Sequence, residues 1–116
     1  MNEQEMKEAM EQWLDNLIEA CKIIGTPFNP DPENETEYWE TTRCIHVHEP
    51  DKALHMNRVD RIANILGLQL YVRYPKVTED GKELQCFEYY VTYKGYEFFE
   101  FSRVSKNYEN VKEAKK

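Results

Sequence analysis

The sequence predicts an α+β fold in the order α-β-α-β-β-β, with two helices packed on one face of a four-stranded, mainly antiparallel sheet. Two stretches in which apolar residues recur at helical spacing, 1–24 and about 51–66, predict the helices. Further along the chain, stretches in which apolar and polar residues alternate, separated by Gly-containing turns, predict three strands of an antiparallel meander. These strands are expected at about 68–76, 84–93 and 96–104.

The first helix is predicted from a stripe of apolar residues at spacings of three and four. The stripe consists of Met6, Met10, Trp13, Leu17, Cys21 and Ile24, and Leu14 and Ile18 widen it. Acidic residues crowd the start of the helix, where they complement its dipole, and Gly25 followed by Pro27 is a good stop signal. We expect the stripe to pack onto the sheet. Its near-heptad spacing leaves a helix-pairing seam in a dimer as the alternative.

Between the first helix and the first strand, prolines alternate with Asn and Asp over residues 26–37. Because proline fixes the backbone and disfavours helix in the residue before it, this segment is predicted to be a surface loop. A strand is expected at about 40–48, and Pro50 suits the first turn of the second helix. Gly67 is expected to close that helix.

Two turn signals define the predicted meander. Asp80-Gly81 and Lys94-Gly95 are dipeptides that favour tight hairpin turns. A two-residue turn at Lys94-Gly95 pairs Val91 with Phe98 and Tyr90 with Phe99, which places large aromatic side chains on both faces of the sheet. At 116 residues the chain is expected to form one domain over 1–116, ending in a frayed tail at 106–116.

The charge of the chain is uneven. Residues 1–42 hold eleven acidic and two basic side chains, a net charge of −9, whereas the remainder has a net charge of +2. Direct binding to nucleic acid is therefore disfavoured, because it depends on clustered Lys and Arg. The acidic third could instead mimic nucleic acid. Three widely spaced cysteines indicate reduced thiols, and no apolar run is long enough to cross a membrane, so a cytoplasmic protein is expected.

One group of residues has the chemistry of a metal site. Cys44, His46 and His48 alternate along the predicted strand, so all three side chains should share one face. Asp51 or His55 could complete a zinc-type site from the following segment. A metal-binding protein, and with it a hydrolase, is therefore the alternative function. Otherwise no cofactor is expected.

The aromatic residues of the last two strands are the second functional signal. Because neighbouring residues in a strand point to opposite faces, helices on one face cannot cover all of them. Tyr90, Phe99 and Phe101 are expected on the uncovered face, where such residues commonly form a protein interface. The alternative is that the first helix or the proline-rich loop covers this face.

These signals together predict a small acidic protein-binding or regulatory module. Besides the aromatic face, an acidic face of the first helix is a candidate contact surface, formed by Glu8, Glu11, Asp15 and Glu19. The partner is expected to be another protein or a second copy in a homodimer. The sequence contains no Gly-x-Ser-x-Gly nucleophile motif and no Gly-rich phosphate loop, so an enzyme is not expected. Size and acidity also fit an inhibitor or accessory protein of a bacterium or mobile element.

Overall fold

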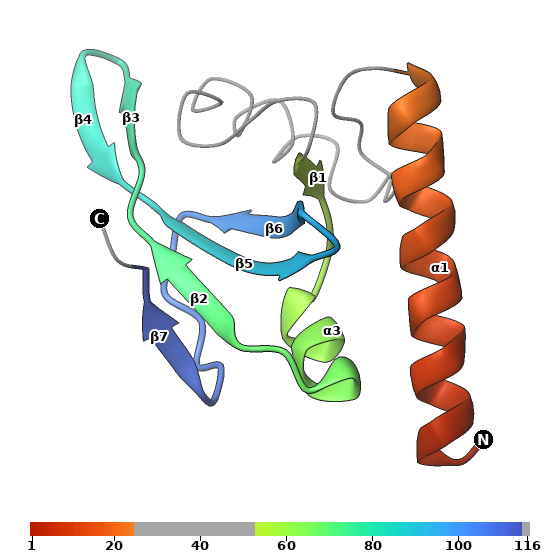
Figure 1. The fold of residues 1–116 in the computed structure, drawn as a ribbon. Coiled ribbons are helices and arrows are strands. Elements are labelled where there is room, and N and C mark those ends of the chain that lie inside the picture. The colour runs from red at the N-terminus through yellow and green to blue at the C-terminus, as the bar shows by residue number, and fades with distance from the viewer. Residues whose placement is uncertain (25–52, 115–116) are drawn as a thin grey trace.

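The computed structural model describes residues 1–24 and 53–114, which form an α+β fold. Two helices pack on a five-stranded mixed sheet with the strand order β1-β6-β5-β2-β7, and a separate two-stranded hairpin projects from it (Figure 1). The helices are α1 (Glu3–Ile24) and α3 (Val59–Leu66). The strands are β1 (Ala53–His55), β2 (Leu70–Arg73), β3 (Lys76–Glu79), β4 (Lys82–Gln85), β5 (Phe87–Tyr93), β6 (Tyr96–Ser102) and β7 (Val111–Glu113).

The prediction of a long first helix is confirmed. Asn2 caps α1, because its side-chain Oδ1 accepts a hydrogen bond from the backbone N–H of Glu5 at 2.8 Å. Leu14, Ile18 and Cys21 are buried in the core. Figure 1 shows α1 running along one side of the molecule, beside α3.

The predicted helix over 51–66 is wrong over residues 53–58, while residues 51–52 lie outside the described part of the chain. Residues 53–55 form β1, which pairs in parallel with β6, and the helix α3 begins at Val59. Arg58, which precedes α3, has a left-handed backbone with φ 57°, so no helix continues upstream through it. The predicted end at Gly67 is confirmed, since Gly67 has φ 67° and donates its N–H to the carbonyl of Ala63.

The turn at Lys94-Gly95 and its register are confirmed. Both residues have positive φ, 50° and 82°, as a tight hairpin turn requires. Val91 pairs with Phe98, and Tyr90 pairs with Phe99. The strands β2, β5 and β6 therefore form the predicted antiparallel centre of the sheet.

The prediction of two uninterrupted strands over 68–76 and 84–93 is wrong, because each is broken in two. Asp80-Gly81 closes the short hairpin β3–β4, which forms a sheet of its own. Proline has no N–H to donate to a sheet ladder, and the break falls at Pro75, whose carbonyl accepts a hydrogen bond from the N–H of Cys86. The hairpin lies beyond the main sheet, at the upper left of Figure 1.

The C-terminal segment is not a frayed tail over its whole length. Residues 111–113 form β7, which pairs in parallel with β2 and supplies one edge of the sheet. The N–H of Ala114 continues this ladder to the carbonyl of Val72, and Gln69 bonds the carbonyl of Asn110 at 2.6 Å. Within residues 1–24 and 53–114, β1 lies at the opposite end of the sheet, which has five strands and is mixed, where four mainly antiparallel strands were predicted.

The core lies between the helices and one face of the sheet. The sheet contributes alternate residues of its strands to this cluster, among them Val72, Tyr89, Val91 and Phe98. The opposite face presents the intervening residues, including Tyr71, Tyr90 and Phe99, which lie in one row across β2, β5 and β6. The predicted loop at 26–37 and strand at 40–48 lie outside the described residues.

Candidate functional site

The solvent side of α1 has an uncharged, mainly apolar stripe. Its large side chains, Met6, Trp13 and Ile23, are 39%, 45% and 78% exposed. The smaller Ala9, Asn16 and Ala20 fill the intervening turns at spacings of three and four. We call these six residues the α1 stripe. It contains no charged residue in a chain of which 32% is charged.

The α1 stripe corrects the sequence-based interpretation of the first helix. Met6 and Trp13 were expected against the sheet, yet both are exposed. The core takes Cys21 of the predicted stripe, together with Leu14 and Ile18, which were predicted to widen it, and Met10 and Leu17 pack against this core. Since the apolar arc of α1 is wider than the surface that its neighbours cover, part of the arc faces solvent.

Acidic side chains border the α1 stripe. Glu5 and Glu19 lie next to it, with the uncharged Gln12 between them at seven-residue spacing, and all three residues are exposed. Residues 1–24 have a net charge of −4, whereas the other described residues, 53–114, hold equal numbers of acidic and basic side chains. The net negative charge of the described residues therefore lies in residues 1–24, which contain α1.

Of the four acidic residues predicted as a contact surface on the first helix, two are exposed and two are half-buried. Glu8 and Glu19 are exposed, while Glu11 is half-buried. Asp15 accepts hydrogen bonds from Lys94 Nζ at 2.9 Å and from the Tyr93 hydroxyl at 3.0 Å. The ammonium group of Lys94 lowers the pKa of Asp15, and these contacts fasten α1 to the β5–β6 turn. Asp15 is therefore engaged within the chain.

A groove opens beside the first two turns of α1. It has a volume of about 770 Å³ and lies between α1 and α3. Its lining consists of Asn2, Glu3, Gln4, Met6, Lys7, Asn64 and Ile65. Met6 belongs to both surfaces, so the groove continues the α1 stripe toward α3.

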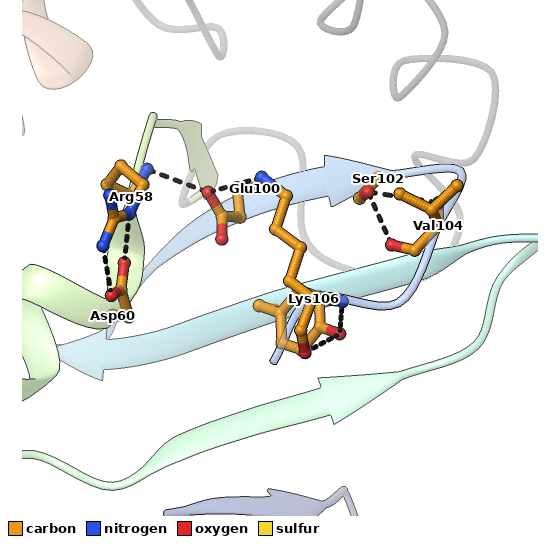
Figure 2. Close-up of polar contacts among 7 residues, drawn as sticks. Arg58, Asp60, Glu100, Ser102, Val104 and Lys106 are labelled. Atoms are coloured by element: carbon orange, nitrogen blue, oxygen red, sulfur yellow. Dashed lines mark hydrogen bonds and ion pairs between the residues drawn. The ribbon is translucent and has the colours of Figure 1, made fainter. Parts of the chain in front are cut away.

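Apart from the α1 stripe, a polar cluster surrounds the buried carboxylate of Glu100, on the helix-facing side of β6. Glu100 is 2% exposed, and its Oε2 accepts a hydrogen bond from the backbone N–H of Arg58 at 2.8 Å. Lys106 Nζ lies 3.6 Å from the same oxygen (Figure 2). The guanidinium of Arg58 donates two hydrogen bonds to Asp60, at 2.9 and 2.8 Å. The cluster joins the start of α3, strand β6 and the segment after β6.

The segment between β6 and β7, residues 103–110, is held against the sheet by hydrogen bonds. The backbone N–H of Lys106 donates to the Tyr89 hydroxyl at 2.9 Å. Ser102 Oγ donates to the carbonyl of Val104 at 2.7 Å (Figure 2). Burial, together with the nearby carboxylate of Glu100, raises the pKa of Tyr108.

A polar groove of about 550 Å³ adjoins this cluster. Its lining consists of Arg58, Asp60, Asn64, Lys106, Asn107, Tyr108 and Glu109. Arg58 and Lys106 each lie 5.8 Å from the centre of the Tyr108 ring. Because its cations are matched by Asp60 and Glu100, the cluster is suited to fixing the start of α3.

On the opposite face of the sheet, the predicted aromatic surface is largely closed. Phe99 and Phe101 were expected to face water, but they are 2% and 1% exposed. The row of Tyr90 and Phe99 extends to His55 of β1, whose ring contacts Phe99 edge-on at 5.4 Å. The face of the sheet was predicted correctly, since Tyr90, Phe99 and Phe101 all lie on it. The exposure of the two phenylalanines was predicted wrongly.

Tyr90 is half-buried between two other side chains. The guanidinium of Arg73 lies 4.0 Å from the centre of its ring, and Tyr71 stacks on it at 5.5 Å. Arg73 also bonds the carboxylates of Glu88, at 2.6 Å, and Glu97. An interface role for Tyr90 stays a prediction, and part of its ring surface is already covered.

The predicted metal site falls mainly outside the described residues. This is true of Cys44, His46, His48 and Asp51, so a zinc site built on them stays a prediction. His55 is described, and it is buried in β1 against Phe99. Within 1–24 and 53–114, no group of three His, Cys, Asp or Glu residues is arranged to hold a metal ion.

Neither described helix is long and apolar enough to cross a membrane. Compared with protein-family models, with curated proteins and with solved structures, the chain matches none. The surfaces described above are therefore what supports a function.

Proposed function

We propose that this chain is a protein-binding module whose contact surface is the α1 stripe. The observation that supports this most directly is Trp13, which is 45% exposed between Met6 and Ile23 in an uncharged stripe. Exposed apolar surface of this kind commonly marks an interaction site. Tryptophan is also among the residues that contribute most to binding energy in interfaces.

The scaffold suits this role. Leu14 and Ile18 hold α1 against the core, and the Asp15 contacts with Lys94 and Tyr93 fix its position beside the β5–β6 turn. A contact surface that is already folded loses little conformational entropy on binding. The partner is another protein or, as a competing possibility, a second copy of this chain.

Site-specific photo-cross-linking in the cells that make the protein tests this proposal. A photoreactive amino acid replaces Gln12, which is exposed beside the α1 stripe. The matched control places the same group at Leu84, an exposed residue of the β3–β4 hairpin. We expect a protein partner to be trapped at position 12 and absent, or much weaker, at position 84.

The trapped partner is then purified, and its affinity is measured for the wild type and for Trp13→Ala. Truncation of a central tryptophan should weaken the complex by about tenfold or more. The matched control is Tyr74→Ala, which removes an aromatic residue of similar exposure, 40%, away from α1. Equal affinity of Trp13→Ala and wild type would overturn the proposal, as would equal trapping at the two positions.

A further inference from the structure

We infer that the partner segment is a basic amphipathic helix that lies along the α1 stripe. This inference rests on the proposed function and specifies the chemistry of the partner. It follows from the spacing of the stripe, the sizes of its residues and the charges along its border.

The geometry of the stripe fits a helix. Its residues recur at spacings of three and four along α1, which is 22 residues long, or about 33 Å at ~1.5 Å per residue. Side chains at these spacings form the ridges and grooves into which a second helix packs at a shallow crossing angle. An extended strand, whose side chains alternate with a period of two, would meet the stripe out of register.

The sizes of the stripe residues provide places for a partner's side chains. Ala9 lies between Met6 and Trp13, and Ala20 lies between Trp13 and Ile23. Small residues between large ones leave recesses on a helix surface, and apolar side chains of a partner can enter them. The partner is therefore expected to present Leu, Ile or Met at its own three-and-four spacing.

The charges along the border favour a basic partner over a second copy. Glu5 and Glu19 lie along one border of the stripe, and residues 1–24 have a net charge of −4. In a homodimer that pairs two copies of α1 antiparallel, the same acidic border meets itself, and like charges at flanking positions are destabilising. Lys or Arg at the flanking positions of a partner would instead pair with Glu5 and Glu19 and accelerate association.

The size of the surface also bears on the choice of partner. A helix about 33 Å long and ~10 Å wide offers roughly 330 Å² for contact. A stable interface buries about 800 Å² on each partner. Apolar contact along α1 by itself is therefore small for a stable dimer, and a partner with opposite charge gains the attraction that a second copy lacks.

Binding of designed peptides to the whole chain, followed by fluorescence anisotropy of a label on the peptide, tests the inference. The probe is a helical peptide with Leu at the apolar heptad positions and Lys at the flanking positions. A second peptide has Glu at the flanking positions, and a third has the composition of the first in an order that is not amphipathic. We expect only the first to bind, with an affinity that falls as salt is raised.

Variants of the chain locate the site. Trp13→Ala should weaken binding of the Lys-flanked peptide by about tenfold or more. The double variant Glu5→Gln, Glu19→Gln should weaken binding and flatten its salt dependence. The matched control is Glu83→Gln, Glu109→Gln, which removes the same charge from exposed positions away from α1 and should change neither.

The outcomes separate the inference from the proposed function. Equal binding of the Lys-flanked and non-amphipathic peptides, or binding that is unchanged in Glu5→Gln, Glu19→Gln, would overturn the basic helix. If sedimentation shows instead a dimer that Trp13→Ala dissociates, the stripe still binds protein and the occupant is a second copy. If the partner trapped at position 12 contacts the stripe through a segment that is not a basic helix, the inference also fails while the function stands.

Discussion

Replacement of Phe99 by alanine decides between the two roles that the sequence and the structure give this residue. The sequence places Phe99 on an exposed interface, where its loss should leave the fold intact. In the structure Phe99 is 2% exposed, so almost the whole ring would be removed from a packed site. Truncation of a buried phenylalanine costs about 3–5 kcal/mol, because apolar contact is lost and a cavity remains.

The expected loss can be measured by urea unfolding followed by circular dichroism. With a denaturant dependence of about 2 kcal/mol per molar urea, a loss of about 4 kcal/mol lowers the midpoint by roughly 2 M. Phe98→Ala is the matched comparison, since Phe98 is the adjacent residue on the opposite face of β6 and is 0% exposed. We expect the two variants to lose similar free energies of unfolding.

If Phe99→Ala is too unstable to purify, Phe99→Leu gives the smaller, measurable loss expected of a change in shape within a core. Substitutions at exposed positions usually change stability by no more than about 0.5 kcal/mol. A midpoint for Phe99→Ala within that margin, beside a large loss for Phe98→Ala, would refute the burial of Phe99. It would also restore the aromatic sheet face as the candidate interface.

Two further predictions concern charged residues. Glu100→Ala leaves the N–H of Arg58 without its carboxylate acceptor and should cost about 2–3 kcal/mol, whereas Glu100→Gln keeps an acceptor and should cost less. Urea unfolding of both variants measures this, and equal losses would contradict the role of Glu100 as the acceptor for the Arg58 N–H. Lys94 lowers the pKa of Asp15 below its ordinary 3.8, so the contact stabilises the fold above about pH 4, and this contribution disappears as the pH falls through the lowered pKa. Asp15→Asn should flatten the loss of stability in acid, and an unchanged slope of the free energy of unfolding against pH would speak against the contact.

The elements that the sequence predicted well are those determined locally. Asn2 and the residues that follow it define the start of α1, and Gly67 ends α3 through its own left-handed backbone. The register of β5 and β6 follows from the turn at Lys94-Gly95, because a two-residue turn with positive φ fixes which residues face each other. Each of these features depends on a few neighbouring residues.

The edge strands could not be predicted in the same way. Residues 53–55 and 111–113 are too short to show a pattern, and each becomes a strand because a distant strand, β6 or β2, offers an open edge. The helical spacing of apolar residues over 51–66 therefore predicted a helix across residues 53–55, which form β1. Tertiary pairing decided the structure of both segments.

The candidate site likewise has features that the local sequence predicts and features that depend on tertiary packing. The apolar stripe and the acidic residues of α1 are visible in the sequence, but their orientation is not, because the position of α3 and the sheet decides which side of the helix is covered. Likewise, the pairing of Tyr90 with Phe99 was predicted, whereas the burial of Phe99 was not. The contact of Glu100 with Arg58 joins residues from two separate elements and has no local signal.

The two parallel pairs at the edges of the sheet also set an order for folding. The β5–β6 hairpin closes a two-residue turn, whereas the β1–β6 and β2–β7 pairs each close a loop of roughly forty residues. Loop closure costs entropy before the distant contacts form, so we expect the hairpin to be structured in the folding transition state and both edges to join afterwards. Substitutions in β1 and β7 should then mainly speed unfolding, with φ-values near zero, while those around the β5–β6 turn should mainly slow folding.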